Sequence, residues 1–368
     1  MTKIAVSDIT LDNAYGGGQL IAKELYQNLS KYYEIYPINI YGVDSAFNLI
    51  GDYLHKKSIF RKLKIGGLLR RYHFMNKVFS HLFIKKLNYN VELLISNNFF
   101  DKMLIDNIKF KNIIIINHAA STISGLDKFI DYVKLMKKHC KKFSVITLNK
   151  THYSLLNKVF PGNVKLVYNG ISSQKVIAQK SALEKFNLDN KKFVLYLGRL
   201  HESGKKVSYI IKAFSMLKET NLYLVIAGDG PDFKNYISLS KELNIEKNVI
   251  FTGFIQQNEK YLLFKTAEIV IQPSLNENFS LVTIEAMQQG AIVITTKNDG
   301  SQDIIEDGKN GFFTKINEQD IKNKIEYILR LDQEKINNIK ENAIKTSNKF
   351  TLEKMINDYK SLIDKILE

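Results

Sequence analysis

Short apolar runs rich in β-branched residues alternate with amphipathic stretches along this chain, and this rhythm constrains the fold more than any other feature. Residues 113–116 and 291–296 are the clearest of these runs. Continuous apolar strands are typical of sheets covered by helices on both faces, so the pattern predicts parallel sheets. The expected strands are residues 4–6, 34–40, 91–96, 113–116, 144–147, 165–168, 193–197, 222–227, 249–252, 268–271 and 291–296.

The length and the polar segment 171–190 together indicate two domains. At 368 residues the chain exceeds the roughly 100–150 residues most common for one domain. The alternation of expected strands and helices is interrupted in the polar segment and resumes at residue 193. We therefore expect an α/β protein with two Rossmann-like domains, residues 1–172 and 173–349, whose parallel sheets face a central cleft. Residues 350–368 carry apolar side chains at helical spacing and should form a helix that packs back towards the N-terminal domain.

The opening of the chain and its apolar runs predict a cytoplasmic protein. The sequence begins Met-Thr-Lys-Ile-Ala-Val, which has the pattern of a strand and lacks the basic and long apolar regions of a signal peptide. No apolar run approaches the ~20 residues that a membrane-spanning helix needs. The single cysteine, Cys140, excludes an internal disulfide and fits a reducing compartment.

Positive charge is concentrated in the first half of the chain. Residues 1–170 hold 25 Lys and Arg against 11 Asp and Glu, and the segment 56–86 holds ten basic residues and no acidic one. Aromatic and aliphatic residues are interleaved with these charges, which suits peripheral contact with an anionic membrane at its inner face. A solvated face on a lysine-rich protein is the simpler alternative. Nucleic acid is disfavoured because no recognised nucleic-acid motif accompanies the charge.

Two glutamates, Glu277 and Glu285, are separated by seven residues late in the chain. The first follows an apolar strand and Pro273 in a polar turn, and the second lies about two turns into the expected helix that follows. Carboxylates at the carboxyl edge of a parallel sheet, beside a helix N-terminus, suit a hydroxyl-rich ligand that carries phosphate. The spacing therefore points to nucleotide-sugar chemistry.

Two cations and a glycine-rich segment are further candidates for binding phosphate. Arg199 comes just after the expected strand 193–197, and Lys205 follows six residues later. Arginine can donate hydrogen bonds to two oxygens at once and lysine supplies a point charge, so the pair can bind one diphosphate. Residues 16–18 are glycines in an expected loop between the first strand and the first helix, which should start at about residue 19. Backbone amides of this loop can approach a ligand closely. The segment 228–231 is interpreted mainly as a tight turn.

His118 is the candidate from the first half of the chain. It follows the apolar run 113–116, and ligands bind at the carboxyl ends of such strands. From position alone a structural role and a functional one are equally plausible.

Taken in order, these segments resemble glycosyltransferase family 4 (group 1), the retaining nucleotide-sugar transferases of GT-B fold. The resemblance covers nearly the whole chain and is most diagnostic in the C-terminal half. The segments that carry it are residues 16–18, 169–170, 198–200, Lys205, 228–231, Gly253, 273–274, 277–285 and 307–311.

The resemblance implies a role for each matching residue. Arg199 and Lys205 would hold the donor diphosphate, assisted by the amides of residues 16–18. Glu277 would contact hydroxyls of the transferred sugar, and Glu285 would bind the ribose hydroxyls. The implied catalytic residues are His118, which would orient the sugar, with Arg199, Lys205 and Glu277. The implied donor-binding residues are Gly16, Gly17, Gly18, Arg199, Lys205, Phe254, Ile255, Glu277, Asn278, Phe279, Ser280, Leu281 and Glu285.

The sequence departs from the family pattern at four positions. Asn278 stands where a small residue or proline is usual, and Ser280 stands where glycine or proline is usual, which leaves the donor sugar open. Lys206 stands where glycine is common, and Asp303 stands where glutamate is usual.

The resemblance implies transfer of a hexose or an N-acetylhexosamine, from a UDP-sugar in preference to a GDP-sugar, with retention of configuration. No Asp-x-Asp motif occurs, and the fixed cations can replace a metal, so we expect no metal and no other cofactor. The basic first half favours a lipid-linked or glycan acceptor of the cell envelope, as in the synthesis of lipopolysaccharide, capsule or another polysaccharide. Two alternatives stay open, a GT-B nucleotide-sugar 2-epimerase and a basic nucleic-acid-binding protein.

Overall fold

The computed structural model describes residues 2–7, 17–38, 90–96, 109–118, 123–173, 181–218 and 221–368. They form two compact units. The first comprises Met1–Thr147, Tyr153–Val167 and Ile356–Glu368, and the second comprises Leu148–His152 and Tyr168–Met355. The basic segment 56–86 lies outside the described residues. Among the described residues, none of the helices combines the length and the hydrophobicity that a membrane span requires.

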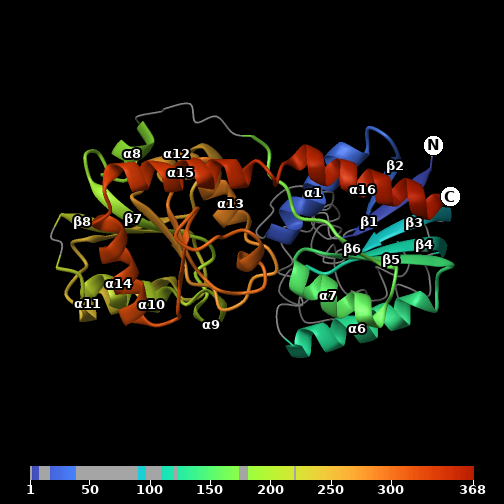
Figure 1. The fold of residues 1–368 in the computed structure, drawn as a ribbon, viewed down its shortest axis with the longest axis horizontal. Coiled ribbons are helices and arrows are strands. Elements are labelled where there is room, and N and C mark those ends of the chain that lie inside the picture. Colours follow the sequence, from blue (N-terminus) through green and yellow to red (C-terminus); the bar gives the residue numbers. More distant parts are fainter. Residues whose placement is uncertain are drawn as a thin grey trace, which may run out of the picture. The chain divides into compact units, whose positions relative to one another are not determined.

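The first unit is built on a parallel sheet, six-stranded among the described residues, with the order β2-β1-β3-β4-β5-β6 (Figure 1). Its strands are β1 (Lys3–Ser7), β2 (Glu34–Ile38), β3 (Asn90–Ser96), β4 (Lys109–Ile116), β5 (Lys142–Thr147) and β6 (Val164–Leu166). The central register places Ile4 opposite Leu93. Because the strands are parallel, their carboxyl ends share one edge, where residues 117 and 118 follow β4.

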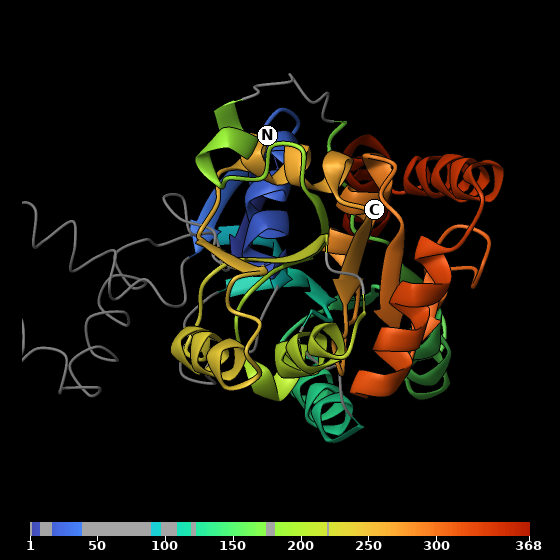
Figure 2. The same cartoon turned by 90° about the vertical axis from the view of Figure 1, so that its left-hand side faces the viewer.

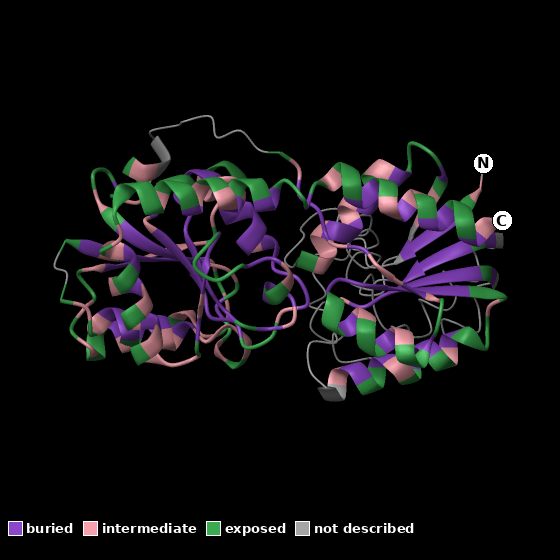
Figure 3. Ribbon diagram, in the orientation of Figure 1, coloured by how far each residue is buried: buried purple, intermediate pink, exposed green. Residues whose placement is uncertain are grey.

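Helices cover both faces of this first sheet. They are α1 (Gly17–Leu29), α6 (Ile123–Lys137), α7 (Lys150–Val159) and α16 (Leu352–Leu367). The strands of the sheet are mostly buried, whereas the helices alternate buried and exposed positions, as amphipathic helices do (Figure 3). The hydroxyl of Tyr33 donates a 2.6 Å hydrogen bond to Asp364, which fixes α16 to the rest of its unit.

The second unit repeats the architecture with the strand order β12-β11-β10-β7-β8-β9 (Figures 1 and 2). Its strands are β7 (Lys192–Leu197), β8 (Leu222–Ala227), β9 (Val249–Gly253), β10 (Ile269–Gln272), β11 (Val293–Thr296) and β12 (Phe312–Thr314). Its helices are α8 (Ser181–Lys185), α9 (Glu202–Lys205), α10 (Val207–Ser215), α11 (Phe233–Glu242), α12 (Gln257–Thr266), α13 (Leu281–Gln288), α14 (Glu318–Leu329) and α15 (Gln333–Ser347).

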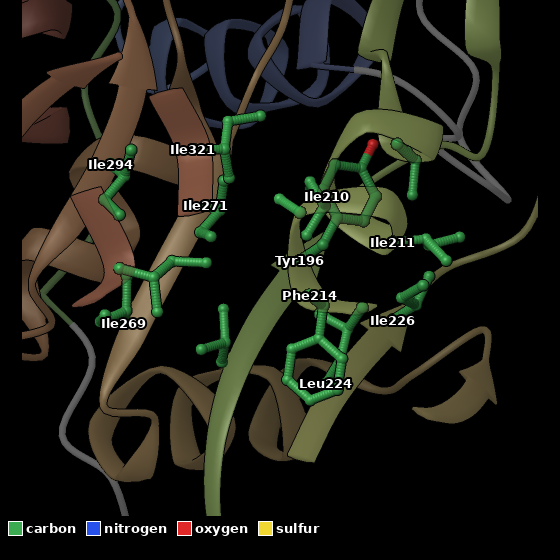
Figure 4. Packing of buried hydrophobic residues seen from close by; sticks show 14 of the residues in the cluster. Tyr196, Ile210, Ile211, Phe214, Leu224, Ile226, Ile269, Ile271, Ile294 and Ile321 are labelled. Atoms are coloured by element: carbon green, nitrogen blue, oxygen red, sulfur yellow. The ribbon is translucent and has the colours of Figure 1, made fainter. Parts of the chain in front are cut away.

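The helices of the second unit divide into two groups. Helices α10, α11 and α14 pack together, and α8, α12, α13 and α15 pack together, with the sheet between them (Figure 1). Between the sheet and the first group lies a core in which Tyr196, Ile210 and Phe214 are buried (Figure 4). Burial of a large apolar side chain contributes roughly 1.5–3 kcal/mol, so this core gives the sheet edge a rigid base.

Two parallel sheets covered by helices confirm the predicted α/β class. The structure adds β12, whose three residues are too few for a period to show in the sequence. It also places Gly17 and Gly18 in the first turn of α1, where the sequence predicted a loop before a helix starting at residue 19.

Candidate active site

The candidate residues of the second unit lie just after strands of one parallel sheet. Arg199 follows β7, Phe254 follows β9 and Glu277 follows β10. β10 pairs with β7 in the sheet, so the segments after these two strands leave the same edge side by side. Residues far apart in the sequence are thereby brought to the carboxyl edge, where parallel sheets bind ligands.

Lys205 and Glu277 form an ion pair at this edge. Their side chains retain 30% and 20% exposure, so both groups remain open to a ligand. The Lys205 ammonium also lies 3.4 Å from the Ser274 hydroxyl. An ammonium and a carboxylate in contact can bind a phosphate oxygen and a sugar hydroxyl of the same molecule.

The turn after Lys205 shows why glycine is common in the family at the position where this chain has Lys206. Lys206 ends α9 and precedes α10 with φ 55° and ψ 37°, which is the left-handed conformation. Glycine adopts this conformation without the steric cost of a Cβ atom. The position therefore favours glycine, and here a lysine adopts the same turn.

Arg199 is exposed, and its backbone is fixed from two sides. Its carbonyl accepts a 3.0 Å hydrogen bond from the buried Tyr196 hydroxyl. A Cβ atom at Gly228 would lie 1.9 Å from the Gly198 carbonyl oxygen, and one at Gly230 would lie 2.3 Å from that of Leu200. The predicted turn at 228–231 thus uses two glycines to pack against the segment that presents Arg199.

Glu285 is almost completely buried on α13 and is paired with a residue that the sequence reasoning missed. The Lys260 ammonium lies 2.6 Å from Glu285 Oε1, and the Tyr261 hydroxyl lies 3.4 Å from the same oxygen. The Lys260 ammonium also lies 4.7 Å from the centre of the Tyr261 ring. A lysine in an amphipathic helix is normally taken as solvated, so the sequence carried no signal for this contact.

The loop between Glu277 and α13 is buried. Asn278, Phe279 and Ser280 are each less than 8% exposed. Ser280 is the N-cap of α13, because its hydroxyl oxygen accepts the Thr283 amide at 3.3 Å. This accounts for serine at a position where the family usually has another residue. The amides of the first turn of α13 begin directly after it, at Leu281.

Phe254 is the most exposed large apolar side chain of the described residues that surround this edge. It retains 77% exposure, and Ile255 beside it is half-buried. Gly253 precedes them with φ 68°, a conformation that suits glycine and turns the chain out of β9. An exposed aromatic ring after a strand end can stack on a nucleobase.

His118 and Gly18 lie together in the first unit. A Cβ atom on Gly18 would be 3.8 Å from His118 Cγ, so the imidazole sits at the start of α1. Within the described residues His118 Nε2 is buried without a hydrogen-bond partner. Burial lowers the pKa of His118 to about 4, so the ring is neutral near pH 7. Gly16 lies outside the described residues.

The stability of the protein should fall in acid because of His118. Its pKa is about 4 in the folded state and about 6.5 in an unfolded chain, so the unfolded state binds more protons between these values. The free energy of unfolding of the wild type should therefore decrease as the pH falls from 6.5 to 4. Urea unfolding of His118→Gln should lack this component, while His139→Gln at an exposed position should keep it. Equal pH dependence in the wild type and His118→Gln would contradict the assignment.

Removing the Lys260 ammonium should destabilise the second unit. Lys260→Met would leave the Glu285 carboxylate buried without its cation, and we expect a loss of about 3 kcal/mol in the free energy of unfolding. Urea unfolding measures the change. Lys265→Met, at an exposed position of the same helix, should change stability by less than about 0.5 kcal/mol. A Lys260→Met variant as stable as the wild type would show that the pair is not maintained in solution.

Residues 178–346 match the family model of the group 1 glycosyl transferases. An uncharacterized glycosyltransferase of Methanocaldococcus jannaschii is 33% identical over 181 residues, which are 46% of this chain and 46% of that protein. The N-acetylgalactosamine-N,N'-diacetylbacillosaminyl-diphospho-undecaprenol 4-alpha-N-acetylgalactosaminyltransferase of Campylobacter jejuni is 34% identical over 162 residues, 44% of this chain and 42% of that protein. The chain thus spans slightly less than half the length of these curated relatives.

The fold is similar to that of a solved structure over 99% of this chain. Anabaena HepE, solved with UDP and glucose, has a TM-score of 0.73 and 16% identity, covering 99% of this chain and 100% of that one. This likeness shows that the protein has the GT-B fold.

Proposed function

We propose that this protein is a retaining glycosyltransferase that moves a hexose or an N-acetylhexosamine from a nucleoside diphosphate sugar, preferably a UDP-sugar, to an acceptor hydroxyl. The observation that carries the proposal is the Lys205–Glu277 pair at the carboxyl edge of the second sheet, with Glu285 in the helix directly after it. Two carboxylates and a cation placed in this way suit a ligand with a diphosphate between two hydroxyl-rich parts. The UDP and glucose bound in HepE support UDP-sugar as the donor class.

Departure of the nucleoside diphosphate would build negative charge on its phosphate oxygens. Arg199, Lys205 and the amides at the start of α13 would stabilise that charge, and one such donor is typically worth about 3–4 kcal/mol of barrier. Glu277 is already engaged with Lys205, which favours a role in binding sugar hydroxyls. The acceptor would then attack from the face that the leaving phosphate occupies, and this phosphate would take the acceptor proton. A neutral His118 would orient the sugar.

Turnover of a donor panel tests the proposed activity. The purified protein would be incubated with UDP-, GDP- and ADP-sugars and a lipid extract, with and without EDTA. We expect transfer from one donor class in both conditions and an α-linked product from an α-donor, read from the anomeric proton by NMR. Loss of turnover in EDTA with rescue by Mg²⁺ or Mn²⁺ would contradict metal independence. Conversion of the donor sugar with no acceptor present would identify a 2-epimerase instead.

For the acceptor, we propose a lipid-linked or envelope glycan reached at the inner face of the cell membrane. The basic segment 56–86 supports this, and so does the Campylobacter relative, whose name specifies a diphospho-undecaprenol acceptor. Liposome co-sedimentation tests it, with binding expected to anionic vesicles and lost at high salt. Binding to neither anionic nor neutral vesicles, together with salt-dependent binding to RNA or DNA, would favour the nucleic-acid alternative.

A further inference from the structure

Asn149 is a fully buried polar residue between β5 and α7, and its side chain makes two different contacts. Its oxygen accepts the amide of His152 at 2.8 Å, which caps the start of α7. Its amide nitrogen donates to the backbone carbonyl of Asn278 at 3.1 Å. One side chain therefore joins the start of a helix to the loop that carries Glu277.

The neighbouring carbonyl of the same loop is held in a similar way. Gly300 donates its amide to the Glu277 carbonyl at 2.8 Å. A Cβ atom at Gly300 would lie 2.7 Å from that oxygen, so the approach requires glycine. Two successive carbonyls of the loop, those of Glu277 and Asn278, thus accept hydrogen bonds from two other segments of the chain.

Asp303 connects these two segments. One carboxylate oxygen of Asp303 accepts the Lys150 amide at 2.7 Å and the Tyr168 hydroxyl at 3.0 Å. The carboxylate thereby links Lys150 and Tyr168, which belong to the second unit, to the short helix η2 (Ser301–Asp303) of the same unit. Asp303, which replaces the usual glutamate at this position, therefore accepts hydrogen bonds from other groups of the protein.

An aromatic cluster completes the support behind the loop. The ring of Phe279 lies 5.8 Å from that of Tyr168 and 5.4 Å from that of Phe350. Tyr168 also packs edge-on against Phe350 at 5.3 Å. Tyr168 therefore belongs both to the hydrogen-bonded contact with Asp303 and to the packing of the loop.

We propose that Asn149 is a positioning residue for the sugar end of the donor, acting through the Asn278 carbonyl on the loop that presents Glu277. The inference rests on the proposed function, because it needs Glu277 to meet the transferred sugar. An unpaired buried carbonyl is costly, so without the Asn149 donor the loop would move to find another partner. Displacement of a positioning group by about 1 Å can lower the rate on the order of a hundredfold.

Two variants separate positioning from folding. Asn149→Asp keeps an oxygen that can cap α7 and has no donor for the Asn278 carbonyl. Asn149→Ser also keeps a capping oxygen and loses the longer side-chain amide that donates to this carbonyl. Asn163→Ser and Asn163→Asp are matched controls, because the Asn163 side chain lies in an exposed turn and donates to the Pro161 carbonyl. The measurements are kcat and KM with the accepted nucleotide sugar, the Kd of the free nucleoside diphosphate, and the thermal midpoint.

We expect kcat to fall tenfold or more in both Asn149 variants, with the Kd of the nucleoside diphosphate within about twofold of wild type. In the proposed function the nucleotide end would be held by Arg199, Lys205 and Glu285, and the Asn149 side chain donates to the Asn278 carbonyl instead. Unchanged kcat would overturn the inference. An equal loss of kcat and of diphosphate affinity, with a lowered thermal midpoint, would also overturn it, since that pattern marks a general structural role. Failure of the wild type to use any nucleotide sugar would instead overturn the proposed function.

Discussion

Lys205→Met should lower kcat for sugar transfer by about a hundredfold to a thousandfold. The Lys205 ammonium pairs with Glu277 and contacts Ser274, and it remains 30% exposed at the sheet edge. A donor diphosphate placed there would gain a fixed positive charge as its leaving group becomes more negative. This stabilisation grows in the transition state, so the change should appear in kcat more than in KM. Steady-state kinetics with the accepted donor measures it.

Two further variants test whether the loss of kcat is due to the positive charge at Lys205. Lys192→Met removes a lysine at the start of β7, on the opposite edge of the same sheet, and should leave kcat unchanged. Lys205→Arg keeps the charge but alters its geometry, so it should restore part of the activity. If Lys205→Met retains near wild-type kcat, the diphosphate is not neutralised by this residue.

Glu277→Gln should lower kcat/KM by about tenfold to a hundredfold. The variant keeps the shape of the side chain but loses the charge that strengthens hydrogen bonds to sugar hydroxyls, and such bonds contribute about 1.5–3 kcal/mol. The Lys205 ammonium would also lose its partner, because the two groups are in contact. Kinetics with the accepted donor measures the effect, and Glu268→Gln, just before β10 at the other end of that strand, is the control.

Mass spectrometry of the wild-type enzyme during turnover separates binding from nucleophilic catalysis. Glu277 as a binding residue predicts that no glycosylated enzyme accumulates during turnover. Mass spectrometry that finds a sugar covalently attached to Glu277 would contradict this role and indicate double displacement. Because Lys205 and Glu277 are in contact, the losses of activity caused by the two substitutions should not be independent. The Lys205→Met/Glu277→Gln double variant should therefore lose less activity than the product of the two single losses.

The fold could be predicted because most of its strands are continuous apolar runs. The run 113–116 lies within β4 and the run 222–227 coincides with β8, since a strand buried on both faces must be apolar throughout. β12 could not be predicted, because three residues do not define a period. The first helix starts at Gly17, two residues before the predicted start, because glycine gives no local signal for a helix.

The candidate site could be predicted in part, from residues that follow strands. The sequence placed Arg199, Lys205 and Glu277 near one sheet edge, and the structure brings the last two into contact. It gave no indication of Lys260 or Asn149, because their partners lie far away in the sequence. Lys260 has the spacing of a solvated helical residue, and a lone asparagine after a strand has the pattern of an ordinary cap. Only the fold shows that each one contacts a carboxylate or a carbonyl of the site.

Binding of the donor to the second unit is the central claim, and a thermal-shift titration tests it most directly. Wild-type protein and an Arg199→Ala/Lys205→Ala variant would be titrated with UDP-, GDP- and ADP-sugars. At a hundredfold excess over its Kd, the true donor should stabilise the wild type by about 2.7 kcal/mol, and the variant should show little or no shift. An equal shift in both proteins, or no shift of the wild type with any nucleotide sugar, would contradict the account.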